Sequence, residues 1–154
     1  MINTIKENFN RALFALIFSI ITIGTLSFLS FETPYGLFLA GSFGSSMVLL
    51  FGYPESPFAQ PKNVFFGHLV TSAVGVLILM FLPVDQFLQI AIAVGLGIFV
   101  MIILGVTHPP AGGNPIVIIL GAVSYDFLLN PIIFGSIIII VYAIILNRFI
   151  LKKN

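Results

Sequence analysis

The sequence predicts an all-α integral membrane protein, and three observations carry the prediction. Of its 154 residues, 59% are hydrophobic and only 7% are charged, whereas roughly a quarter of a soluble domain is charged. The mean hydropathy is +1.19. Uncharged apolar runs alternate with short proline-containing polar segments, and several runs reach the length of about 20 residues that a bilayer-spanning helix needs. We therefore expect a single transmembrane domain over residues 1–154.

Composition also argues against several classes of function. The net charge is +1, without the clustered basic residues that nucleic-acid binding requires. The chain has no cysteine, which excludes disulfides and thiol catalysis. No residues have metal-site spacing, and no carboxylate pair lies in an apolar run. We expect neither a metal nor another cofactor, and we do not expect an enzyme.

The first half of the chain predicts three helical segments. Residues 12–31 form an uncharged run that is too long for a signal-peptide core, so we expect a retained first helix. Residues 37–53 contain a small-residue patch at 41–46, which allows close packing or a break in the helix. Residues 54–63 hold three prolines and predict a loop. Residues 64–82 follow as the third helix, with His68 near its start.

The second half predicts three more segments around a proline-rich centre. Residues 87–106 form a full-length run, and the consecutive Pro109 and Pro110 should end that helix near Thr107 and extend His108. Asn114 is expected to cap a new helix with Pro115 in its first turn. Residues 115–123 are apolar but too short to cross a bilayer as a regular helix. After a turn at 126–131, residues 131–146 form the last segment.

Basic residues favour six crossings over four, because Lys and Arg accumulate on the cytoplasmic side. With six, all basic residues face the side of the N-terminus, and Glu32, Asp85 and Asp126 face the opposite side. With four crossings, residues 37–53 and 115–123 would not cross the membrane, and Lys62 would lie on the non-cytoplasmic side. We expect six crossings with both termini cytoplasmic in a multi-pass protein of a cell membrane, most simply a bacterial plasma membrane. The six basic residues are Lys6, Arg11, Lys62, Arg148, Lys152 and Lys153.

Six segments also expose a weak internal repeat between residues 12–82 and 87–148. Gly44 and Gly52 have the same separation as Gly113 and Gly121, and a Phe-Gly pair follows in each half. Three helices per half would make this a 3+3 inverted repeat, an arrangement in which transporters bind substrate between interrupted helices. Glycine is abundant here, so chance repetition explains the pattern equally well.

The segment around His108 is the strongest candidate for a substrate site. An ionisable residue at membrane depth is costly and is a functional hypothesis by default, although His108 could instead bond a carbonyl that the prolines leave unpaired. Gly112, Gly113 and Asn114 would present backbone N–H groups to an anion at a helix start. A plain tight turn explains the two glycines equally well.

Two further groups of polar residues are secondary candidates for substrate binding. Ser42, Ser45 and Ser46 could line the other half of the same site, although helix packing explains each serine at least as well. His68 could contribute to the site or could hydrogen-bond to a neighbouring helix, and we slightly favour the second interpretation.

Together these motifs resemble the HPP family of membrane proteins. The resemblance rests on residues 107–112, with the sequence Thr-His-Pro-Pro-Ala-Gly, and on residues 41–46, 56–63 and 67–68 in the same order. It covers most of the chain from about residue 36 to residue 148. The family is described as small four-helix membrane proteins, which conflicts with six crossings, and members in photosynthetic organisms are associated with nitrite transport. The resemblance implies a nitrite-like anion permease and marks as motif positions His108, Pro109, Pro110, Gly112, Gln60, Asn63 and His68.

Three functions therefore remain open at the level of sequence. The first is a transporter or channel for a small inorganic anion, with nitrite as the leading substrate. The second is a membrane scaffold that transports nothing, and the third is a pore for a small neutral solute. We expect membrane lipid and further copies of the chain as partners, because six short helices enclose little interior, and we expect no nucleic acid.

Overall fold

Four long helices define the architecture of this part of the chain. The computed structural model describes residues 2–151, in which all regular structure is helical. Four of its helical stretches are long and apolar enough to cross a membrane, which confirms the all-α membrane fold. The long helices are α1 (Ile2–Phe31), α3 (Pro61–Phe81), α4 (Gln86–Ile103) and α6 (Phe134–Leu151).

In each half of the chain, a short helix lies between two long ones. Helix α2 (Gly41–Met47) continues into a π-helical turn, η1 (Val48–Gly52), and α5 (Asn114–Leu120) follows a 3-10 turn, η3 (Pro109–Gly113). Six helical segments are therefore present, as expected, but only four have the length of a full span. Residues 36–40 before α2 and residues 106–108 before η3 have no regular structure. Non-helical backbone therefore leads to the short helical element of each half.

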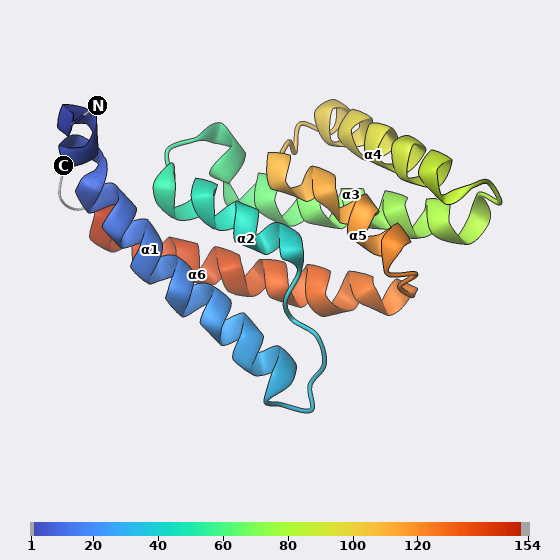
Figure 1. Ribbon diagram of the computed structural model, residues 1–154, viewed down its shortest axis with the longest axis horizontal. Coiled ribbons are helices and arrows are strands. Elements are labelled where there is room, and N and C mark those ends of the chain that lie inside the picture. The colour runs from blue at the N-terminus through green and yellow to red at the C-terminus, as the bar shows by residue number, and fades with distance from the viewer. Residues whose placement is uncertain (1, 152–154) are drawn as a thin grey trace.

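The described ends of the chain lie at the same end of the molecule. Figure 1 shows that α1 begins, and α6 ends, at the same end of the long axis of the molecule. The guanidinium of Arg11 lies 5.6 Å from the centre of the Tyr53 ring, and Arg148 shares a cavity with Gln60 and Pro61. Lys62 follows Pro61 at the start of α3. We call this region the basic end; Lys152 and Lys153, which were also expected here, lie outside the described residues.

Three acidic residues lie at the opposite ends of their helices. Glu32 follows the last residue of α1, Asp85 precedes α4, and Asp126 lies in the 3-10 turn η4 (Tyr125–Leu128) after α5. These three acidic residues therefore lie opposite the basic end, as the six-segment topology predicted, whereas Glu55 lies in the loop before α3 at the basic end. Each short helix, together with its irregular approach, connects the two ends.

Helix α3 is the centre of the bundle. Its apolar window is 39% buried, against 17% for the windows of α1 and α4, and it packs against α4, α5 and α6. Two glycines permit close approach, because a Cβ on Gly67 would lie 2.8 Å from the Cβ of His108 and one on Gly75 would lie 2.9 Å from the Cα of Pro115. The segment that carries His108 is thus packed directly on α3.

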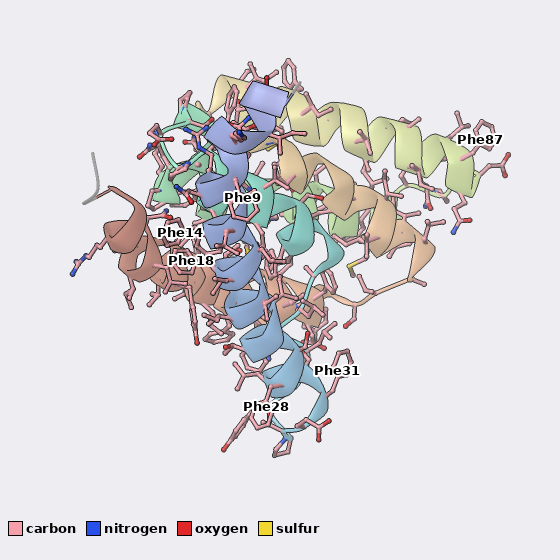
Figure 2. The ribbon with its side chains drawn as sticks, turned by 60° about the vertical axis from the view of Figure 1, so that its left-hand side comes forward. Phe9, Phe14, Phe18, Phe28, Phe31 and Phe87 are labelled. Atoms are coloured by element: carbon pink, nitrogen blue, oxygen red, sulfur yellow. The ribbon has the colours of Figure 1, made fainter. Side chains whose placement is uncertain are left out.

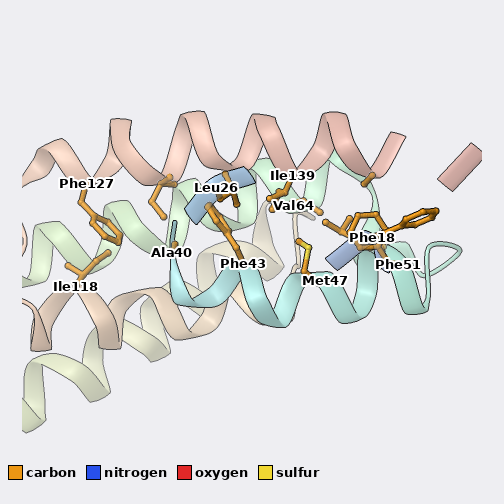
Figure 3. Close-up of a cluster of buried hydrophobic side chains, with 14 of the residues drawn as sticks. Phe18, Leu26, Ala40, Phe43, Met47, Phe51, Val64, Ile118, Phe127 and Ile139 are labelled. Carbon is orange, nitrogen blue, oxygen red and sulfur yellow. The ribbon is translucent and has the colours of Figure 1, made fainter. Parts of the chain in front are cut away.

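The apolar core joins the two halves of the chain, while phenylalanines also cover the outside. Figure 3 shows side chains such as Phe43, Val64 and Ile139 meeting between α2, α3 and α6, and all three are fully buried. Figure 2 shows Phe28 and Phe87 projecting outward, and these are 60% and 67% exposed. Exposed aromatic and aliphatic side chains of this kind suit a lipid environment, in which apolar surface carries no penalty.

The predicted element boundaries shift at three places for identifiable reasons. Helix α4 ends at Ile103 and not near 106, because Gly105 has a φ of +62° and turns the chain. Helix α3 begins at Pro61 and not at 64, since proline suits a first helical position. Helix α6 begins at Phe134, after the turns η4 and η5 (Leu129–Ile133), and η5 contains the cis Asn130–Pro131 bond.

Asn114 does not cap α5, so that prediction was wrong. The residue before it, Gly113, already has helical angles of φ −81° and ψ −13°, and the backbone N–H of Asn114 donates to the Ala111 carbonyl. The turn η3 therefore runs straight into α5. The side chain of Asn114 is left available for another role.

The inverted repeat stays a prediction. Both halves place a short helix between two long ones, and the order is the same in each. The short elements differ in length, however, since α2 and η1 together cover 12 residues, Gly41–Gly52, whereas α5 covers 7.

Candidate functional site: a buried histidine pair

His68 lies inside the bundle on the central helix. It is the eighth residue of α3, which places it about 10 Å along the helix from the basic end at 1.5 Å per residue. Its side chain is fully buried, and the edge of the Phe43 ring packs against it with centroids 5.0 Å apart. The site therefore sits within the apolar part of the molecule, closer to the middle of α3 than to its basic end.

His108 reaches the same place from the second half of the chain. It is extended, with φ −133° and ψ 99°, as expected for a residue before proline. Its side chain is fully buried, and Nδ1 lies 2.8 Å from the carbonyl oxygen of Phe58. The rings of His68 and His108 have centroids 5.0 Å apart, so two histidines that are 40 residues apart in sequence form one pair.

Serines of α2 connect the two histidines. The hydroxyl of Ser46 lies 3.1 Å from His68 Nε2 and 2.9 Å from His108 Nε2, and the hydroxyl of Ser42 lies 3.4 Å from His68 Nδ1. Ser42 and Ser46 are one helical turn apart and therefore share a face. Ser45 lies on the exposed side of α2, so the structure brings two of the three candidate serines into the site.

Asn114 closes the site from the side of α5. Its Nδ2 donates to Ser72 Oγ at 2.9 Å and lies 3.1 Å from His68 Nδ1. It also lies 3.3 Å from the His68 carbonyl and 3.4 Å from Thr71 Oγ1. An amide that ties α5 to three polar residues of α3 fixes the N-terminal end of α5.

These side chains form one network, which we call the histidine cluster. It contains no Lys, Arg, Asp or Glu, and among the described residues no group of three or more His, Cys, Asp or Glu side chains could hold a metal ion. Every member is buried, so the described conformation is closed to solvent on both sides. The members are Ser42, Ser46, His68, Thr71, Ser72, His108 and Asn114.

The glycines and prolines of the candidate segment have structural positions. Pro109 and Pro110 have no backbone N–H to offer, and the N–H groups of Ala111 and Asn114 donate within the turn η3. The backbone therefore presents fewer unpaired donors near Gly112 and Gly113 than a normal helix start would. Both glycines are partly exposed, and a substrate role for them stays a prediction.

The loop motif residues hold the cover of the site. Asn63 Nδ2 donates to the Pro57 carbonyl at 2.9 Å, and Gln60 Nε2 lies 3.5 Å from the Ser56 carbonyl. The 3-10 turn η2 (Pro57–Ala59) lies between Ser56 and Gln60, and it presents the Phe58 carbonyl to His108. A cavity of about 200 Å³ lies between this loop and α6 at the basic end, with Gln60, Asn147 and Arg148 among its lining residues.

Sequence reasoning missed Thr71, Ser72 and the Phe58 carbonyl. A signal for the first two existed, because His68, Thr71, Ser72 and Gly75 follow the i, i+3, i+4, i+7 spacing of one helical face. No sequence pattern points to a backbone carbonyl. That contact requires the loop at 54–60 to fold back over a segment 50 residues later.

Comparison with known proteins now adds to the geometry. The family described as HPP, transmembrane region, matches residues 4–154. The chain belongs to the HPP family. Two transmembrane proteins of Dictyostelium discoideum are also similar: one is 33% identical over 123 residues, which is 75% of this chain and 43% of the relative. The other is 35% identical over 125 residues, which is 77% of this chain and 40% of the relative.

This HPP protein spans less than half the length of those two relatives, and both are named only as transmembrane proteins. No solved structure matches it. The family assignment confirms the resemblance that the His-Pro-Pro motif suggested. The structure gives that motif a physical meaning, because the histidine joins the histidine cluster while the two prolines begin η3.

Proposed function

We propose that this HPP protein transports a small inorganic anion such as nitrite across a cell membrane, and that it is not an enzyme. The observation that carries the proposal is the meeting of two short helices, α2 and α5, at a buried polar cluster inside a membrane protein. Polar side chains in such a place are expensive and usually mark a substrate path. Membership of the HPP family is consistent with this role.

Charge along the molecule supports an anion as the substrate. Arg11 and Arg148 gather at the basic end, where they would raise the local anion concentration. The Nδ1–H of His108 points from the cluster toward this end and donates to Phe58. An anion would take the place of the Phe58 carbonyl as acceptor, with Ser42 and His68 as further donors when the cluster opens.

Transport requires the loop at 54–60 to move, since it covers His108. The cavity lined by Gln60 and Arg148 lies between this loop and α6. Displacing the loop would open His108 toward the basic end without moving a long helix. We also propose that the basic end faces the cytoplasm, in line with the distribution of basic residues.

Purified protein in liposomes tests the proposal. Vesicles containing the wild-type chain should take up nitrite faster than protein-free vesicles at neutral pH, where passive entry of nitrous acid is slow and can be subtracted. His108→Ala should remove the difference. Ser45→Ala is the matched control, because Ser45 lies on the exposed side of α2, and it should transport normally. Wild-type uptake equal to that of protein-free vesicles would contradict the proposal.

A pore for a small neutral solute is a second candidate, because the histidine cluster contains no fixed charge. Both ring nitrogens of each imidazole can find a hydrogen-bond partner while the imidazole is neutral, and such a site could pass urea or ammonia. Anion competition separates the two functions. If urea enters through the protein and nitrite does not slow it, the neutral-solute function replaces the first. A scaffold would pass neither.

We further propose that the chain forms homo-oligomers in membrane lipid. Helices α1 and α4 are mostly exposed, and the small bundle encloses little interior space for a path. Cross-linking in native membranes and the mass of the detergent-solubilised particle would test this. A particle of one chain under both conditions would contradict it.

A further inference from the structure

The two histidines of the cluster are joined by an unbroken path of hydrogen-bonding atoms. From the basic end, the path runs from His108 Nδ1 through the ring to Nε2, then 2.9 Å to Ser46 Oγ, and then 3.1 Å to His68 Nε2. From His68 Nδ1 it continues 3.1 Å to the Asn114 amide. Both gaps at Ser46 are within ordinary hydrogen-bond distance.

Two backbone carbonyls indicate which ring nitrogen of each histidine carries its proton. Phe58 O can only accept, so His108 carries its proton on Nδ1 and, when neutral, leaves Nε2 bare. The Ser46 hydroxyl therefore donates to His108 Nε2, and its oxygen accepts from His68 Nε2–H. At the far end, the His68 carbonyl identifies the nitrogen of the Asn114 amide, which donates to the bare His68 Nδ1.

We infer that His68, Ser46 and His108 form a proton relay, so that the transporter moves a proton together with its anion. This inference rests on the proposed function of anion transport. A proton that binds at His68 Nδ1 makes that ring cationic. Its Nε2 proton then passes to Ser46 Oγ as the Ser46 proton passes to His108 Nε2. When the loop at 54–60 is displaced, His108 releases its Nδ1 proton to water at the basic end. One proton enters, one leaves, and Ser46 ends with one hydroxyl proton.

The relay resets only when the site rearranges. After one passage His68 holds its proton on Nδ1, facing the Asn114 donor, and His108 presents a bare Nδ1 to the Phe58 carbonyl. Both contacts are then repulsive in the closed site, so a second proton cannot follow until the rings or their neighbours move. Displacement of the loop at 54–60 removes the Phe58 carbonyl. A relay of this design passes one proton per conformational cycle and does not leak.

Two structural features support a relay over a passive packing role. The histidines are the only titratable groups in the cluster; the segments packed around them, α2, α5, η2 and η3, contribute no charged side chain. The Ser46 hydroxyl has a second acceptor, since it also lies 3.1 Å from the Ser42 carbonyl. It can therefore rotate between a position on the path and one off it.

The test compares net uptake with exchange. Net proton-coupled uptake requires the site to lose its proton inside the vesicle, whereas exchange of labelled for unlabelled nitrite at equal concentrations and pH does not. In Ser46→Ala we expect protein-dependent net nitrite uptake, and the internal acidification that accompanies it, to fall to the level of protein-free vesicles, while exchange continues. Ser45→Ala should keep both. A merely structural role would remove exchange along with net uptake.

Several outcomes would overturn the relay. Protein-dependent nitrite uptake without internal acidification in the wild type would reject it and leave the anion transporter intact. Unchanged net uptake in Ser46→Ala, or equal loss of exchange, would also reject it, whereas absence of any wild-type nitrite transport would reject the proposed function itself. Nitrogen NMR of the histidine rings gives a reading that needs no transport: we expect the proton on Nδ1 in His108 and on Nε2 in His68, and the reverse pattern would contradict the relay.

Discussion

Gly67 and His108 lie so close together that no side chain fits between them, since a Cβ on Gly67 would come within 2.8 Å of the His108 Cβ. This contact seats the segment 106–108 against α3 and holds His108 beside Ser46. The absence of a side chain at Gly67 in α3 thus allows His108, from the second half of the chain, to take its position in the site.

Gly67→Ala is therefore expected to destabilise the protein and displace His108. The new methyl group would also meet the Val106 carbonyl at 3.1 Å, and overpacking of this kind costs about 1–3 kcal/mol. The thermal midpoint in detergent should fall, and nitrite uptake should fall with it. Gly95→Ala in α4 is the control, because nothing lies within 4 Å of its added Cβ. Equal midpoints for the two variants would show that the contact is not tight.

Asn114→Ala should cost more stability than Asn63→Ala. Asn114 is 2% exposed, and its loss leaves buried acceptors on His68 and Ser72 without a donor, at roughly 1–3 kcal/mol for each unsatisfied group. Asn63 bonds one carbonyl at the exposed loop, where water can replace it. Unfolding of the two variants in detergent, monitored by far-ultraviolet circular dichroism, gives the comparison. A larger loss for Asn63→Ala would place the stabilising contact in the loop.

Thr22→Val and Thr71→Val should change stability in opposite directions. Both side chains are fully buried, but Thr22 Oγ1 has no hydrogen-bond partner, whereas Thr71 Oγ1 donates to the Gly67 carbonyl at 2.8 Å. Valine has nearly the same shape and removes the hydroxyl. We expect Thr22→Val to gain, and Thr71→Val to lose, about 1 kcal/mol. The same sign for both in a detergent unfolding experiment would contradict the assignment.

The sequence predicted the helices better than it predicted the site. Hydropathy and proline positions located all six segments, because each depends on local composition alone. Sequence reasoning also identified His108, since an ionisable group in an apolar chain is conspicuous. It treated His68 as a separate residue, because nothing local indicates that α3 and η3 approach closely enough for two imidazoles to share one hydroxyl. That proximity depends on Gly67, whose close contact is a tertiary property.

The same distinction explains the wrong assignment of Asn114. Asparagine before proline is typical of a helix cap, and local preference alone favours that role. In the folded chain, η3 already supplies helical backbone ahead of α5, and His68 and Ser72 offer the amide better partners. Tertiary contacts therefore outweighed the local preference, and Asn114 joins the histidine cluster through its side chain, whereas the sequence had pointed to its backbone N–H.

The six-segment topology predicts on which side of the membrane single cysteines can be labelled. The chain has no cysteine, so each introduced residue reports one position without background. Cysteines that replace Lys62 and Arg148 should react with a membrane-impermeant maleimide from one side, because both positions lie at the basic end. Cysteines that replace Glu32, Asp85 and Asp126 should react from the other side.

Lys62 decides between the six-segment and four-span topologies. If α2 and α5, with their irregular approaches, each complete a crossing, Lys62 must lie on the side of Arg148, because two segments separate it from the N-terminus and four more follow it. If neither segment crosses, Lys62 moves to the side of Glu32. Labelling in intact cells and in inverted vesicles gives both sides of the comparison, with permeabilised membranes as the control for reactivity. Reaction of the Lys62→Cys variant from the Glu32 side would reject both the six crossings and the inverted repeat that depends on them.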